Sequence, residues 1–182
     1  MTMEPITSYI KHFNNFPAEY LREILHYDPE TGVFTWRAGR GRVKDGAVAG
    51  SILPRREGKG GPTSLVGVRG RKYPAHRLAW VYMTGSWPPL EIDHIDTDSL
   101  NNRWDNLRLA TTQQNGANRG PQKNNSSGFK GVCWNKANKA WRATTRYNGV
   151  KIQIGDFKTP EAAYAAYCAK FIELHGEFAR VA

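Results

Sequence analysis

The chain has 182 residues, which allows one domain or two small ones. Its 26 lysine and arginine residues exceed its 16 aspartate and glutamate residues, and the net charge of +10 indicates a polyanionic partner, usually a nucleic acid, or else a solubility feature. No apolar run approaches the ~20 residues that span a membrane, and Cys133 and Cys168 form no CxxC pair, so neither a structural zinc site nor a disulfide framework is indicated.

The first 61 residues predict a helix, a turn, a strand and a long basic loop. Residues 1–15 form a lead-in without the apolar h-region of a signal peptide, so a cytoplasmic location is expected. Pro17 suits the first turn of a helix over residues 18–26, and a turn at 28–32 leads to a strand at 33–36. Residues 37–61 are rich in glycine, lysine and arginine. We expect a basic arm that contacts nucleic-acid phosphates through Arg40 and Arg42, with a solvated loop as the alternative.

Residues 64–118 predict a hairpin and a short helix. A strand, a loop, a second strand and a helix are predicted to follow, with polar residues where these elements join. The hairpin covers 64–68 and 71–73, and the short helix covers 76–83. Asp93 and His94 end a short apolar run, a second strand covers 107–110, and Thr111 can cap the next helix. An Asp93 carboxylate and an Asn115 amide oxygen suit a hard cation such as Mg²⁺. A neutral His94 can take a proton from water while Asn106 holds its tautomer.

The runs D-H-I-D and N-N-R-W-D-N-L-R and a following helix with Q-N resemble the HNH nucleases, and most closely the phage homing endonucleases. The resemblance implies a ββα-metal site with Asp93 and Asn115 as metal ligands, His94 as general base and Asn106 as its orienter. Asparagine at 115, where histidine is commoner, favours one Mg²⁺ or Mn²⁺ over zinc. In the alternative interpretation these aspartates and asparagines simply form turns. His76 and Arg77 are candidates for contact with the scissile phosphate of DNA, although a structural role suits His76 better.

Residues 119–128 contain only glycine, proline and polar residues and are predicted to be a linker between domains at 1–118 and 129–182. The second domain predicts strands at 130–135, 140–147 and 150–155, with Asn148-Gly149 as a hairpin turn. A helix begins at Thr159-Pro160, ends at Gly176 and covers one face of the sheet. The expected fold class is α+β, with a ββα-metal domain followed by a small three-stranded antiparallel sheet packed on one helix.

Alternation along these strands leaves a basic and polar face open, which suits a β-ribbon that reads the major groove. The patterns G-V-x-W, W-R-A and E-A-A-x-A-A-Y resemble the APETALA/ethylene-response-factor DNA-binding domain. That family contacts DNA through this face, although Cys133 and Asn135 stand where its plant members carry arginine. The predicted DNA contacts are Lys130, Asn135, Arg142, Thr144, Arg146, Lys151 and Gln153. A merely solvated face is the alternative.

These features predict a metal-dependent, site-directed endonuclease acting on double-stranded DNA as a monomer or homodimer, in the cytoplasm of a bacterial host if a phage encodes it. One rival is a DNA-binding protein that retains the nuclease fold without cutting. Another is a nuclease or toxin directed against RNA.

Overall fold

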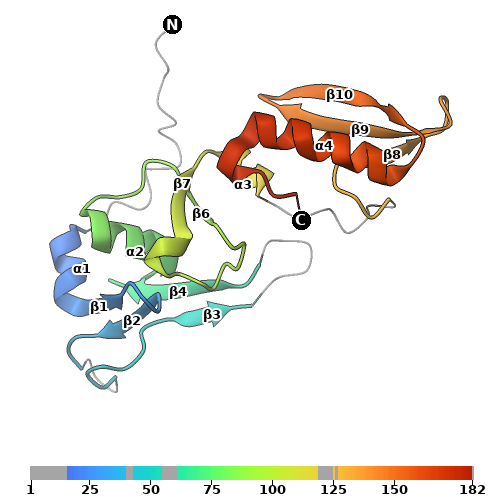
Figure 1. The fold of residues 1–182 in the computed structure, drawn as a ribbon. Helices are drawn as coiled ribbons and strands as arrows, with labels where there is room; N and C mark the ends of the chain where they lie inside the picture. Colours follow the sequence, from blue (N-terminus) through green and yellow to red (C-terminus); the bar gives the residue numbers. More distant parts are fainter. Residues whose placement is uncertain (1–15, 40–42, 55–60, 119–124, 126, 182) are drawn as a thin grey trace, which may run out of the picture. The chain divides into compact units, whose positions relative to one another are not determined.

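The computed structural model describes residues 16–39, 43–54, 61–118, 125 and 127–181. The fold is a mixed α+β arrangement in two compact units, residues 1–109 and 110–182 (Figure 1). The helix that carries Asn115 is therefore grouped with the second unit, although the expected domain ended at residue 118. The domain limits expected from the sequence stay a prediction. No helix in the described part of the chain is long and apolar enough to cross a membrane.

The first unit begins with a helix and a hairpin. Helix α1 covers Ala18–Ile24, strand β1 covers Leu25–Asp28 and strand β2 covers Val33–Trp36. The expected helix was two residues too long, and β1 was missed. Leu25 and Tyr27 are buried while His26 is exposed, and β1 pairs antiparallel with β2. An apolar residue at position 25 suits both a helical stripe and a strand, so periodicity alone did not separate the two.

The long basic loop is partly folded. Strand β3 (Ser51–Leu53) joins β4 (Thr63–Val68) and β5 (Arg71–Pro74) in a sheet of order β3-β4-β5. The backbone before β3 lies against β2, because Trp36 N–H donates to Ala47 O at 2.9 Å and Ala49 N–H donates to Phe34 O at 2.7 Å. The alternative of a solvated loop is therefore wrong for residues 47–53, which pair with β2 and β4, and contact of the basic loop with phosphates stays a prediction. Arg40 and Arg42 lie outside the described residues.

A buried core supports the strands of the candidate site. Helix α2 (Ala75–Thr84) follows the predicted hairpin, and strands β6 (Glu91–His94) and β7 (Leu107–Ala110) form a two-stranded sheet, with a 3-10 turn at Trp104–Asn106 between them. Ile92 of β6 and Leu107 of β7 belong to this core. Its other large members include Leu21, Leu25, Tyr27, Phe34, Val66, Tyr73, Leu78 and Val81.

The second unit has the three-stranded antiparallel sheet and covering helix that the sequence predicted. Helix α3 (Thr112–Ala117) is followed by β8 (Val132–Asn135), β9 (Ala140–Tyr147) and β10 (Val150–Phe157) in the order β10-β9-β8. Helix α4 (Pro160–His175) lies along the sheet and leads into a 3-10 turn at Gly176–Phe178 (Figure 1). Thr159 caps α4, as expected from its sequence. The buried core of this unit contains Val132, Ala143, Ala163, Tyr167, Phe171 and Phe178.

Candidate active site

Strand β6 carries two adjacent polar side chains that are both buried. Asp93 is 4% exposed and His94, the last residue of the strand, is 9% exposed. Neighbouring residues on a strand point to opposite faces, and burying a polar group is costly unless it is hydrogen-bonded. The partners of these two side chains therefore indicate what the site can do.

The His94 imidazole lies beside an asparagine that was not predicted as its partner. His94 Nε2 is 3.2 Å from Asn102 Oδ1, and the Asn102 side chain is buried. Asn102 Nδ2 donates to Leu100 O at 3.1 Å, which turns the amide oxygen toward the ring. With this orientation, a neutral His94 carries its hydrogen on Nε2 and its lone pair on Nδ1. Residue spacing did not mark Asn102 as a partner of His94, and its place in the N-N-R run is the only signal for it in the sequence.

The backbone of Asn102 is fixed by the hairpin β1–β2. The buried Tyr27 hydroxyl donates to Asn102 O at 2.7 Å, and burial foremost raises the pKa of Tyr27, so the phenol stays protonated. Trp104 N–H donates to Pro29 O at 3.0 Å. Gly32 has φ +71°, and a Cβ there would lie 2.4 Å from the Asn102 carbonyl carbon. The hairpin turn and the loop of the site therefore fit together only with glycine at position 32.

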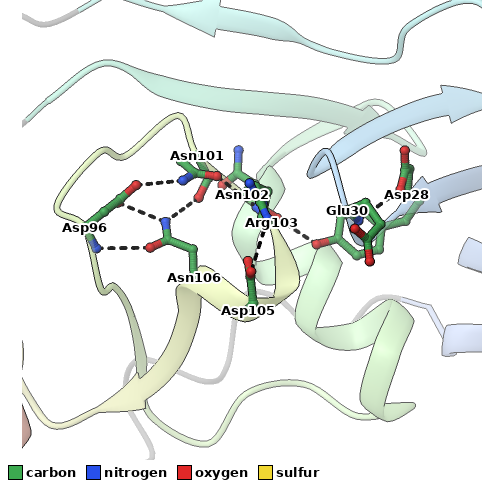
Figure 2. A network of polar contacts seen from close by, with 9 residues as sticks. Asp28, Glu30, Asp96, Asn101, Asn102, Arg103, Asp105 and Asn106 are labelled. Atoms are coloured by element: carbon green, nitrogen blue, oxygen red, sulfur yellow. Dashed lines mark hydrogen bonds and ion pairs between the residues drawn. The ribbon is translucent and has the colours of Figure 1, made fainter.

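Asn106 holds the loop between β6 and β7. Its Oδ1 accepts from Asp96 N–H at 3.0 Å, and its Nδ2 donates to Asp96 Oδ1 at 2.9 Å and to Asn101 O at 2.8 Å (Figure 2). The predicted contact from Asn106 to His94 is therefore replaced by bonds to the loop, and Asn102 takes the place beside the imidazole. The cause is local: Asn106 ends a 3-10 turn that directs its side chain into the loop.

The Asp96 carboxylate accepts several of the hydrogen bonds that hold this loop. Burial acts to raise its pKa, but hydrogen bonds from Asn101, Asn106 and the Asp98 backbone outweigh burial and hold the pKa below its usual value. Asn101 Nδ2 donates to Asp96 Oδ2 at 2.6 Å, and Asp98 N–H donates to Asp96 Oδ1 at 2.8 Å. The ionised carboxylate therefore closes the turn after His94.

Asp93 is paired with a cation that the sequence analysis did not single out. Arg108 of β7 approaches Asp93 Oδ2 at 3.0 Å through Nε and at 2.9 Å through Nη2. The two side chains are only 14% and 5% exposed. A buried carboxylate needs a compensating charge, and Arg108 supplies one.

His76 lies edge-on to His94, with ring centroids 5.1 Å apart and planes 87° apart. Burial, followed by the neighbouring His94 and Arg77, lowers the pKa of His76 to about 3. His76 is therefore neutral at neutral pH and packs against His94 as an uncharged ring. Arg77 is half-buried on α2. The predicted contacts of both residues with DNA phosphate stay predictions.

Helix α3 carries Asn115, the fourth of the residues predicted for the site. Thr111 and Gln114 form a capping box: Thr111 Oγ1 accepts from Gln114 N–H at 3.2 Å, and Gln114 Oε1 accepts from Thr111 N–H at 2.8 Å. Asn115 N–H donates to Thr111 O at 2.9 Å, and its side chain is half-buried. The predicted cap is confirmed, and metal binding by Asn115 stays a prediction.

Comparison with known proteins assigns the family. A family model described as HNH endonuclease matches residues 73–117, a range that contains Asp93, His94, Asn106 and Asn115. Protein 3.8 of Escherichia phage T7 is 38% identical over 106 residues, which cover 58% of this chain and 87% of the phage protein. The chain belongs to the HNH endonuclease family.

A second relative of the nuclease is the Uncharacterized HNH endonuclease L560 of Acanthamoeba polyphaga mimivirus. It is 39% identical over 110 residues, which cover 59% of this chain and 56% of the mimivirus protein. The chain therefore matches little more than half the length of that relative. No solved structure matches the nuclease.

HNH nucleases generally use a divalent metal. Within the described ranges, no cluster of three or more histidine, cysteine, aspartate or glutamate side chains could hold a metal ion. Asp93 is a buried anionic oxygen donor and Asn115 an amide oxygen donor, and this chemistry fits a hard cation that keeps several waters. Oxygen donors of this kind fit such a metal better than one that prefers sulfur ligands, and the joint binding of a metal by the two residues stays a prediction.

In the second unit, two of the side chains predicted to contact DNA bind a carboxylate of the same sheet. Arg142 donates to both oxygens of Asp156 at 2.7 and 2.8 Å, and Asn135 Nδ2 lies 3.4 Å from Asp156 Oδ2. The pair holds the pKa of Asp156 below its usual value, chiefly through the Arg142 hydrogen bonds. Arg142 and Asn135 therefore both bind Asp156 within the sheet, and their predicted contacts with DNA stay predictions. The expected strand ended at Gly155, whereas β10 continues through a bulge after Gln153 that sets Asp156 opposite Arg142.

Lys130 is likewise bound within the protein. Its Nζ donates to Ala117 O at 2.8 Å and Arg180 O at 3.2 Å, and lies 4.4 Å from the Phe171 ring centre. Burial foremost lowers its pKa to about 8. Lys130 is therefore held by backbone carbonyls of its own unit and does not stand free on the open face, and its predicted contact with DNA stays a prediction.

The remaining predicted contacts of the second unit stay on one accessible face. Arg146 lies directly opposite Lys151, and Thr144 lies opposite Gln153 in the β9–β10 register. Arg146, Lys151 and Gln153 are exposed, and Thr144 is half-buried. Like charges opposite each other on a sheet are unfavourable, so the Arg146–Lys151 pair suits a polyanionic partner.

Proposed function

We propose that this nuclease hydrolyses phosphodiester bonds of double-stranded DNA at chosen sites, with His94 as general base and one divalent metal, and that the sheet of the second unit reads the DNA. The single observation that carries the proposal is the buried Asp93-His94 pair, with the His94 imidazole held by Asn102 at 3.2 Å. Membership of the HNH endonuclease family supports the same chemistry.

His94 is suited to move one proton. Because Asn102 Oδ1 accepts the hydrogen on Nε2, Nδ1 of the neutral ring takes the proton from an attacking water. The water oxygen forms a bond to phosphorus as the bond from phosphorus to the leaving oxygen breaks. His76 adds a neutral ring beside His94 and no positive charge that would oppose its protonation. The family resemblance implies a 5′-phosphate and a 3′-hydroxyl as products.

Asp93 and Asn115 would hold the metal, with Mg²⁺ the best match to their oxygens and Mn²⁺ the alternative. When bound, the metal supplies positive charge that stabilises the phosphate and the leaving oxygen. The ion pair with Arg108 compensates the charge of the buried Asp93 carboxylate when no metal is bound.

The second unit supplies affinity and site choice in this proposal. Arg146 and Lys151 contribute the salt-dependent attraction to phosphates, and Thr144 and Gln153 contact bases. The sheet and covering helix are the arrangement expected from the resemblance to the APETALA/ethylene-response-factor domain. Arg142 and Asn135 bind Asp156 and position the sheet.

The test is cleavage of supercoiled plasmids carrying phage genomic inserts, with Mg²⁺, Mn²⁺ or EDTA. Wild type is compared with His94→Gln and with the matched control His26→Gln, which changes an exposed histidine of β1. We expect metal-dependent cutting that His94→Gln abolishes and His26→Gln retains. Cutting by His94→Gln at the wild-type rate would refute the proposal, as would wild-type binding to these inserts without cutting in any metal.

A further inference from the structure

A pocket of about 410 Å³ opens at the edge of β9 within the second unit. Strand β8 pairs with β9 only along residues 140–143, so the remainder of β9 has an edge that β8 does not cover. The walls of the pocket come from that edge, from α3, from the residues before β8 and from the last turns of α4. Its polar wall residues include Lys130, Thr144, Thr145, Arg146, Lys151 and His175.

His175 is a buried polar residue that lines this pocket. It is the last residue of α4 and is 8% exposed, and neither ring nitrogen has a hydrogen-bond partner among the described residues. The ring packs on Phe171, at 4.3 Å between centroids, and on Tyr147 at 5.4 Å. Burial, and then Lys130, lowers the pKa of His175, so the ring is neutral with one N–H donor. Buried polar atoms without partners are rare and indicate a ligand or water that satisfies them.

Positive charge surrounds this donor. Lys130 is fixed at the wall by the carbonyls of Ala117 and Arg180. Arg146 and Lys151 face each other across β9 and β10, and no aspartate or glutamate is among the residues that line the pocket. The volume is in the range of small-ligand sites.

We propose that this pocket binds a phosphate group, and that in the nuclease at work this is a backbone phosphate of the DNA on the sheet. The His175 N–H and the Thr145 hydroxyl donate hydrogen bonds, and Lys130, Arg146 and Lys151 neutralise the charge. This inference rests on the proposed DNA reading by the second unit. It adds a deep, fixed phosphate contact to the exposed side chains on the open face.

The experiment uses the full chain in EDTA, so that DNA is bound without being cut. Imidazole NMR signals are recorded during titration with inorganic phosphate and then with duplex DNA. His175→Phe assigns the His175 signal and serves as the binding variant, because phenylalanine keeps the ring packing on Phe171 and Tyr147 and removes both nitrogens. His26→Phe, at an exposed position of β1, is the matched control.

We expect phosphate to shift the His175 signal saturably and duplex DNA to displace it. His175→Phe should weaken DNA binding about tenfold with no loss of thermal stability, whereas His26→Phe should leave affinity unchanged. A phosphate shift that DNA does not displace would support the phosphate site but assign it to a free anion. A His175 signal that neither inorganic phosphate nor duplex DNA shifts would refute phosphate binding in this pocket.

A third variant separates the two levels of the proposal. Arg146→Gln should lower the slope of log affinity against log salt by about 1. If Arg146→Gln has this effect while His175→Phe changes nothing, the pocket fails and the reading face stands. If neither variant alters DNA binding, the proposed reading face itself fails and the pocket fails with it.

Discussion

Asn106→Ala should destabilise the loop between β6 and β7. The side chain is 8% exposed and makes three hydrogen bonds, two with Asp96 and one with Asn101 O. The two neutral bonds contribute about 1 kcal/mol each net, the bond to the ionised Asp96 carboxylate contributes about 1.5–3 kcal/mol, and each group left buried without a partner costs about 1–3 kcal/mol. Some of these groups can reach water because Asp96 is exposed, so we expect a loss of about 2–4 kcal/mol. The matched control is Asn101→Ala, which removes one side-chain bond to Asp96 and should cost about 1 kcal/mol.

Two readouts measure this effect. Urea unfolding gives the stability of each variant, and hydrogen exchange at the Asp96 amide, which donates to Asn106 Oδ1, reports opening of the loop itself. Cleavage should fall in proportion to the loop opening. If Asn106→Ala has the stability and amide protection of Asn101→Ala but loses cleavage, the loop-holding role is refuted and the orienting role expected from the sequence regains support.

Three further changes test other parts of the structure. Gly32→Ala should cost about 1–2 kcal/mol or more, because φ is +71° and the added Cβ would lie 2.4 Å from the Asn102 backbone; unchanged unfolding and cleavage would contradict the fit of hairpin and loop. His76 has a folded pKa of about 3 against 6.5 unfolded, so its stability contribution is complete above pH 6.5 and declines as pH falls toward 3. Between pH 6.5 and 5.5 the loss should be about 1 kcal/mol in urea unfolding and absent in His76→Phe; equal pH slopes would contradict this. Arg142→Gln should lower stability and leave the salt dependence of DNA binding unchanged, whereas Arg146→Gln should reduce that salt dependence. Equal effects of the two variants on the salt dependence would contradict the assignment of Arg142 to the sheet and of Arg146 to DNA.

The sequence predicted most elements because local signals agree with tertiary packing. The Asn148-Gly149 turn, the Thr159 cap and the Thr111 cap each have a single favourable structure, and each occurs as expected. Strand β1 was missed because its first residue extends the apolar stripe of α1. Strand β3 was missed because Ser51–Leu53 is short and its three residues are exposed, so no alternation in burial marks it.

The candidate site was predicted in its residue types and only partly in its contacts. Asp93 and His94 are buried together on β6, as expected for functional polar groups. Asn102 and Asn106 lie four positions apart, and either could reach back to β6 on sequence grounds. Which of them meets His94 depends on a Tyr27 hydroxyl 75 positions away from Asn102, a contact that residue spacing does not reveal.

General-base catalysis by His94 is the central claim, and chemical rescue tests it most directly. Cleavage of a DNA target under single-turnover conditions is compared between wild type and His94→Ala, with and without added imidazole. We predict a loss of about 10²–10⁴-fold with DNA affinity retained, and partial recovery with imidazole that rises with the fraction of neutral imidazole. A variant that cuts within a few-fold of wild type would contradict the claim. So would a complete loss of cutting that imidazole does not restore while DNA and metal binding remain intact.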